Sequence, residues 1–207
     1  MLINKSIADF LAELKSNSPA PGGGSAAALA GAIGAALGIM VGHLTVSSAK
    51  YEAVHEESKK LISKLDERLR ALEKYIDEDT EAFNKVMKAY KLPKGTEEEK
   101  GVRSGAIQDA LKEASILPWQ VANSCLEILK MSNRMLCIGN TNAASDAAVA
   151  GRLAQAAIWS AVYNVRINLS SIQDTYFVAD MQKKVEEIIK SSEIELSQLI
   201  ESANEKI

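Results

Sequence analysis

The sequence has few of the residues that commonly bind metals or carry redox chemistry. It contains two cysteines and two histidines among 207 residues. Cys125 and Cys137 match no zinc or redox spacing, so we expect reduced thiols, as in a cytoplasmic protein. His43 and His55 are twelve residues apart and cannot share a metal on one straight helix. We therefore expect no metal site.

Other absences exclude further classes of function. The net charge is -3 with acids and bases interspersed, so no basic tract indicates binding to nucleic acid. Asp9 and Glu13 fall where a signal peptide needs an apolar core. The three glycines at 22–24 are not followed by the Lys-Ser/Thr pair of a nucleotide loop, and no Gly-x-Ser-x-Gly nucleophile motif occurs. Acid–base chemistry by carboxylates remains.

The balance of apolar residues predicts the fold class. Hydrophobic residues make up 47% of the chain but aromatic residues only 5%, so the core consists of Ala, Leu, Ile and Val. No segment shows sustained two-residue alternation, whereas several show helical periodicity. We predict an all-α helical bundle without significant β-sheet, folded as one domain over residues 1–207.

One stretch without charge organises this bundle. No charged residue lies between Ser16 and Ala49, and prolines and glycines predict a loop up to Gly24. We expect Ser25 to be the N-cap of a long Gly/Ala-rich helix that ends near Thr45. This helix is long enough to cross a bilayer, but Ala and Gly insert weakly and no aromatic belt flanks it. We therefore expect a buried central helix, whose glycines favour close packing and at least a homodimer.

The remaining segments predict further helices. The expected ranges are 6–15, 50–90, 96–117, 118–136, 142–171 and 175 onward. Thr96 and Glu99 form a capping-box pattern, and Pro118 either kinks one helix or starts the next.

Asp79 is the most informative acidic residue. Steps of three and four place it on the apolar stripe of its helix, between Ile76 and Phe83. An apolar site raises the pKa of a carboxyl toward values useful in proton transfer, although a structural carboxylate is the alternative. Asp77 and Glu78 are rotated away from the stripe, and we expect both to be solvated.

Two further groups of residues suggest binding. Asp146, Asn164 and Asn168 share one face of the 142–171 helix, where buried carboxamides must form a polar network or bind a polar heterocycle such as a pterin. The loop of Gly22, Gly23 and Gly24 offers free N–H groups at a helix start, which suits an anionic or carbonyl-rich ligand.

Several motifs together resemble the cyclodeaminase domain of the formimidoyltransferase-cyclodeaminase family, in a stand-alone form. They occur in order over nearly the whole chain: Pro-Gly-Gly-Gly-Ser-Ala-Ala-Ala at 21–28, Gly34-Ala-Ala-Leu-Gly-x-Met-Val41, Asp77-x-Asp-x-x-Ala-Phe83, Leu92-Pro-Lys, Cys137-x-Gly-Asn140, Ser145-Asp146 and Asn164-Val-x-Ile-Asn-Leu169.

The resemblance implies an all-helical homodimer that binds a tetrahydrofolate derivative and needs no metal or redox cofactor. The family's cyclodeaminase closes 5-formiminotetrahydrofolate to 5,10-methenyltetrahydrofolate and releases ammonia. Its stand-alone relatives include methenyltetrahydrofolate cyclohydrolases, which interconvert the methenyl compound and 10-formyltetrahydrofolate. A non-catalytic helical scaffold that has kept the fold is a third interpretation.

The resemblance also implies roles for the candidate residues. Asp79 is the expected general acid–base, and Asp146 the second catalytic carboxylate. Asn140, Asn164 and Asn168 are expected to orient the pterin or hold the amidine, and the loop from Gly22 to Ser25 to bind a polar part of the folate. The candidates for a folate glutamate or polyglutamate tail are Lys94, Arg103, Lys50 and Arg152.

Overall fold

The computed structural model describes all residues, 1–207, and consists of helices without any strand. This confirms the all-α prediction. The six α-helices are α1 (Ile7–Leu14), α2 (Gly23–Val46), α3 (His55–Tyr90), α4 (Glu97–Ile138), α5 (Ala144–Leu169) and α6 (Thr175–Lys206). Three short 3-10 turns, η1 (Leu2–Asn4), η2 (Ala49–Val54) and η3 (Thr141–Ala143), connect or precede them.

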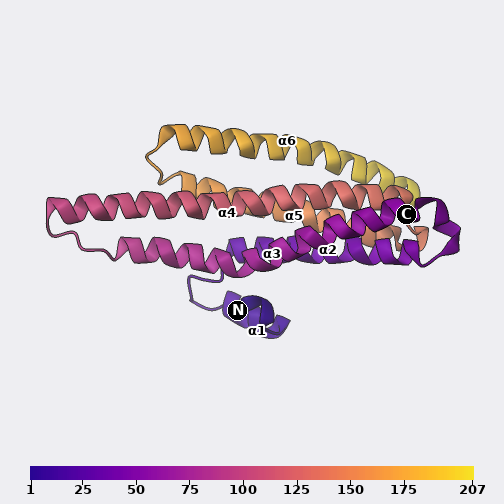
Figure 1. Cartoon of the computed structure of the whole chain (residues 1–207), viewed down its shortest axis with the longest axis horizontal. Helices are drawn as coiled ribbons and strands as arrows, with labels where there is room; N and C mark the ends of the chain where they lie inside the picture. The colour runs from indigo at the N-terminus through magenta and orange to yellow at the C-terminus, as the bar shows by residue number, and fades with distance from the viewer.

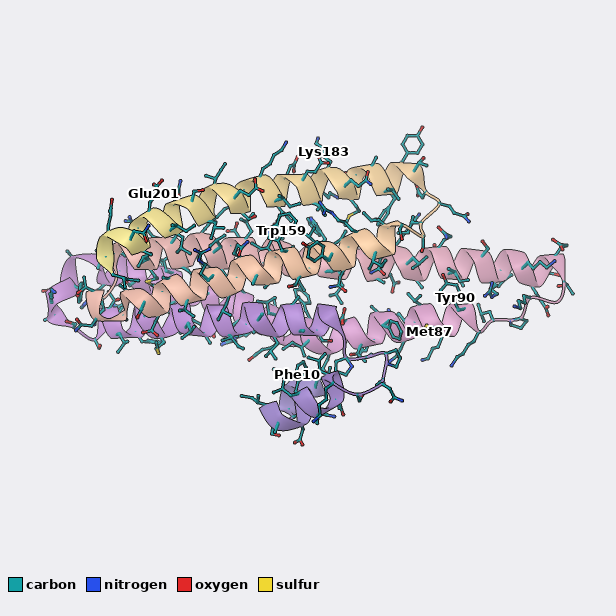
Figure 2. All side chains as sticks on the ribbon, turned by 180° about the vertical axis from the view of Figure 1, so that it is seen from behind. Phe10, Met87, Tyr90, Trp159, Lys183 and Glu201 are labelled. Atoms are coloured by element: carbon teal, nitrogen blue, oxygen red, sulfur yellow. The ribbon has the colours of Figure 1, made fainter.

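The long helices form an elongated bundle in two layers (Figure 1). α3 and α4 pack side by side in one layer, and α2 and α5 form the layer behind them, while α6 packs on α4 and α5. Seen from behind, α2 and α5 face the viewer with no other helix in front of them (Figure 2). α3 and α4 continue past the start of α2 and the end of α5 as a two-helix arm, which ends in the loop 91–96.

α2 packs against α3, α4 and α5 because its glycines allow close approach. A Cβ added at Gly34 would lie 2.9 Å from the backbone oxygen of Ala150 in α5, and one at Gly31 would lie 2.5 Å from Sγ of Cys125 in α4. By length and composition α2 could cross a membrane, but in this bundle 56% of its most apolar window is buried. Packing within the chain therefore accounts for these glycines.

Some features near helix ends differ from those expected from the sequence, because residues distant along the chain bind there. α2 begins at Gly23 with Gly22 as its N-cap, so Ser25 is not the cap. The Ser25 N–H instead donates to Asp79, a side chain from another helix that serves as the cap. Asp77 is not simply solvated, because its carboxylate accepts hydrogen bonds from the backbone N–H groups of Leu2 and Ile3. The N-terminal turn is thereby attached to α3.

Three expectations about where helices start have different outcomes. Thr96 caps α4 and forms the predicted capping box with Glu99. Pro118 does not start a new helix, because α4 runs from Glu97 to Ile138 without interruption. α3 begins at His55 rather than Lys50, since η2 occupies the intervening residues.

Candidate active site

A cavity of about 320 Å³ lies where α2 begins and α5 ends, with α3 and α4 as its other walls. Six residues predicted from the sequence line it: Gly22, Gly23, Gly24, Asp79, Asn164 and Asn168. Its apolar wall includes Phe83, Val86 and Ile167. The cavity thus combines one carboxyl and two carboxamides with an apolar surface.

Asp79 is the only acidic residue in this cavity. Its Oδ2 accepts hydrogen bonds from the Ser25 N–H at 2.9 Å and from the Ser25 Oγ at 3.0 Å, and no lysine or arginine forms an ion pair with it. Burial raises the pKa of Asp79, while the two hydrogen bonds from Ser25 act in the opposite direction. A carboxyl with a raised pKa and without a paired cation is suited to exchange protons with a ligand.

Gly24 allows the Asp79 carboxyl to approach the backbone of α2. A Cβ added at Gly24 would lie 2.0 Å from Oδ1 and 2.9 Å from Oδ2 of Asp79. No side chain fits in that space, so the carboxyl packs directly on the Cα of this residue. The glycine motif and the carboxylate are therefore parts of one local structure.

The first turn of α2 also presents free hydrogen-bond donors to the cavity. The N–H of Ala26 donates to Gly22 and that of Ser25 to Asp79, whereas the N–H groups of Gly23 and Gly24 have no acceptor within the chain. They lie at the positive end of the α2 dipole. This position favours a ligand oxygen or a developing negative charge.

Asn168 is held by a backbone carbonyl that Pro118 leaves free, a contact that was not predicted from the sequence. Proline lacks an N–H, so Pro118 leaves the carbonyl of Ala114, four residues earlier in α4, without its helical partner. The Nδ2 of Asn168 donates to this carbonyl at 2.7 Å. The signal was present in the sequence, because a proline inside a helix always frees one carbonyl.

Comparisons with known proteins show the family of this chain. The sequence profile of the family described as Formiminotransferase-cyclodeaminase matches residues 6–187. The chain belongs to this family. It is 38% identical over 204 residues to the methenyltetrahydrofolate cyclohydrolase of Methylorubrum extorquens, covering 99% of this chain and 98% of that protein.

Other relatives in the cyclodeaminase family match the same region. The formimidoyltransferase-cyclodeaminase of Sus scrofa is 30% identical over 97% of this chain, which spans 37% of that longer protein. The crystal structure of formiminotetrahydrofolate cyclodeaminase from Thermotoga maritima superposes with a TM-score of 0.90 and 30% identity, over 99% of this chain and 98% of that one. The named relatives therefore belong to two reaction types in folate chemistry.

Three predicted site residues do not line the cavity of this cyclodeaminase-family protein. Ser25 is fully buried behind Asp79, where both of its polar groups bond within the protein, so the predicted contact with folate is replaced by a contact with Asp79. Asn140 bonds to Leu44 and to the N–H of Asn142 at the opposite end of the bundle. Asp146 lies in the first turn of α5, about 27 Å along the helix axis from Asn164.

The predicted cations lie outside the cavity as well. Lys94 is exposed in the loop at the tip of the arm, roughly 16 Å beyond Asp79 along the direction of α3. Arg103 donates from Nε and Nη2 to the backbone oxygen of Tyr90 and lies over the Tyr90 ring. Tyr90 is near the end of the arm (Figure 2). Of the other two candidates, Lys50 lies at the opposite end of the bundle and Arg152 is exposed on α5.

A second, larger cavity of about 480 Å³ lies between α5 and α6. Its charged lining residues, Arg166 and Glu186, are both exposed, and no predicted site residue borders it. The Asp79 cavity, with its buried carboxyl and free N–H groups, is the better candidate for the active site.

Proposed function

We propose that this protein cyclises 5-formiminotetrahydrofolate to 5,10-methenyltetrahydrofolate with release of ammonia, using Asp79 as the general acid–base. The observation that supports this most is the unpaired, partly buried Asp79 carboxyl, which faces a cavity beside free N–H groups. The reaction needs a proton moved between nitrogens, which such a carboxyl performs well. The proposal requires no metal or redox cofactor.

The proposed steps conserve protons. N10 attacks the carbon of the protonated formimino group, and the ionised Asp79 removes the N10 proton as the N10–C bond forms. Asp79 then protonates the former imine nitrogen, which leaves as ammonia when the C–N bond breaks. The carboxylate, ionised in the initial and final states, also stabilises the cationic amidine and methenyl groups through its charge.

The other polar groups are proposed to bind the folate. Asn164 and Asn168 orient the pterin or the amidine, and the Gly23 and Gly24 N–H groups bind a carbonyl or anionic part of the substrate. Lys94 and Arg103, both on the arm, are proposed to attract a glutamate or polyglutamate tail that leaves the cavity in that direction.

The second candidate is methenyltetrahydrofolate cyclohydrolase, because a protein with that name is 38% identical to this chain over nearly its full length. Both reactions pass through a tetrahedral carbon between N5 and N10, so the same carboxyl would serve in each. In the cyclisation direction the two reactions differ in the leaving group, ammonia or water, and in the attacking nitrogen, N10 or N5.

We also propose that the protein is a homodimer formed through the outer face of α2 and α5. This face has large exposed apolar residues, with Ile33 at 46%, Met40 at 39%, Val149 at 48% and Ile167 at 68% exposure, and α2 has no Asp, Glu, Lys or Arg. At 24 and 26 residues the two helices give a face about 36–39 Å long and roughly 18–20 Å wide. That is about 700 Å², close to the ~800 Å² per partner in stable complexes.

This dimer would extend the site, because Ile167 belongs both to the outer face and to the cavity wall. If the two copies pair antiparallel, the Asp146 end of α5 in the second copy would lie beside the cavity. The proposed catalytic role of Asp146 and the binding role of Asn140 depend on such a shared site. We propose a cytoplasmic location, which the two free thiols support.

The test is turnover of Asp79→Asn with each of the two folates, following the methenyl absorbance and ammonia release. We expect a loss of about 10²–10⁴-fold. The matched control is Glu78→Gln, which removes a charge from an exposed neighbouring position and should leave turnover unchanged. Near-normal turnover of Asp79→Asn would exclude the acid–base role. Absence of turnover by the wild-type protein with both folates would favour a non-catalytic scaffold.

A further inference from the structure

The two oxygens of Asp79 have different surroundings. Oδ2 accepts both hydrogen bonds from Ser25, the N–H at 2.9 Å and the Oγ at 3.0 Å. Oδ1 accepts none within the chain and lies against the Cα of Gly24 at the cavity. The asymmetry comes from one residue, Ser25, which is itself fully buried and does not line the cavity.

We infer that Ser25 is a positioning residue that makes Oδ1 the reacting oxygen of Asp79. The inference rests on the proposed acid–base role of Asp79. With both Ser25 donors directed at Oδ2, the negative charge that remains available to a substrate proton is on Oδ1. The protonated oxygen of a carboxylic acid is a poor acceptor, so a proton on Oδ2 would weaken the bond from the Ser25 N–H.

The Ser25 hydroxyl can change its hydrogen-bond acceptor with the charge of Asp79, because it has one proton and two acceptors within reach. Its Oγ lies 2.9 Å from the backbone oxygen of Ile76 and 3.0 Å from Oδ2. When Asp79 is ionised, donation to the carboxylate is the stronger bond. When Oδ1 takes the substrate proton, the substrate N–H bond breaks and the Oδ1–H bond forms. Oδ2 keeps the bond from the Ser25 N–H, while the hydroxyl can turn to the backbone oxygen of Ile76. The proton thus stays on the cavity side for delivery to the leaving nitrogen.

Ser25→Ala tests the inference by removing the hydroxyl and keeping the backbone N–H. A hydrogen bond to a charged group contributes about 1.5–3 kcal/mol, and one pKa unit corresponds to 1.36 kcal/mol. We therefore expect the pKa of Asp79, measured by ¹³C NMR of its carboxyl, to rise by about one to two units. The acidic limb of the kcat/KM profile should move to higher pH by the same amount, because the ionised form starts the reaction.

Three further variants test whether a shift in the Asp79 titration is due to the Ser25 hydroxyl. Ser25→Thr keeps the hydroxyl and should restore the wild-type titration. Ser25→Cys has a similar size but a weaker donor, so it should give an intermediate shift, and it serves if Ser25→Ala does not fold. Ser115→Ala is the matched control, because Ser115 is also fully buried but its hydroxyl donates only to the carbonyl of Leu111. It should leave both the Asp79 titration and the pH profile unchanged.

The outcomes separate this inference from the proposed function. An unchanged Asp79 titration in folded Ser25→Ala and Ser25→Cys would overturn the role of Ser25, whatever the activity. A changed titration with an unmoved pH profile would overturn it too, since the hydroxyl would then act on a carboxyl that does not control the rate. Full turnover in Asp79→Asn would refute the proposed function instead, without affecting the NMR result.

Discussion

Gly24→Ala is the substitution that most directly tests the geometry of the site. The added methyl would lie 2.0 Å from Oδ1 of Asp79 and 2.5 Å from its Cγ. Ordinary contact begins near 3.4 Å, so the carboxyl must move by about 1.4 Å or the start of α2 must shift. Either movement stretches the hydrogen bonds from Ser25 that hold Oδ2.

The expected effect on activity is much larger than the effect on stability. Overpacking costs about 1–3 kcal/mol, and the helical preference of alanine offsets up to about 1 kcal/mol of this. A net loss of about 1–2 kcal/mol corresponds to a Tm decrease of roughly 2–8 °C in a chain of this size. A catalytic group displaced by about 1 Å costs on the order of 100-fold in rate. We expect folded Gly24→Ala to lose at least that factor in kcat.

The controls are the same substitution at Gly101 and Gly105 in α4, where an added methyl meets nothing within 4 Å. Each should raise stability by about 0.5–1 kcal/mol and leave turnover unchanged. The measurements are steady-state kinetics with both folates and thermal unfolding. If Gly24→Ala turned over within about threefold of the wild type, the carboxyl could not be held against Gly24 during the reaction, and the argument from this contact would fail.

The other predictions concern the binding group, the dimer and the thiols. Pro118→Ala should stabilise α4 by up to about 3 kcal/mol but raise KM, because the restored N–H competes with Asn168 for one carbonyl; equal KM values would contradict this. Ile33→Glu should give a monomer by sedimentation with reduced activity, whereas Ile194→Glu, on an exposed position of α6, should leave the dimer intact. Burial raises the pKa of the Cys125 thiol to about 12, so one thiol should react in the native protein and two after unfolding.

Helical periodicity predicted the position of Asp79 because the signal is local and repeated. Ile76 is buried and Phe83 half-buried, on either side of Asp79, as the steps of three and four required. The capping box at Thr96 is equally local and was also predicted. Features that depend only on a few neighbouring residues can therefore be predicted from the sequence of this chain.

The predictions from sequence were wrong where a residue depends on another residue that is distant along the chain. Ser25 has the residue type of an N-cap, but its N–H bonds to a side chain 54 positions away, and the helix starts three residues earlier than expected. Asp146 and Asn164 share a helical face as predicted, but residues on one face can lie far apart along the helix axis. With about 27 Å between them, one small ligand in a single subunit cannot contact both.

The cavity exists because the helices differ in length. The sequence contains the helix lengths but does not show how the helices align with one another. α2 begins at Gly23 and α5 ends at Leu169, whereas α3 and α4 continue past both as the arm. The space beyond the two shorter helices is therefore walled by the longer pair and bordered by helix ends. Helix ends carry unpaired backbone groups, and the last turns of α5 carry the two asparagines. The polar groups of the site are thus grouped where the small-residue packing of α2 and α5 stops.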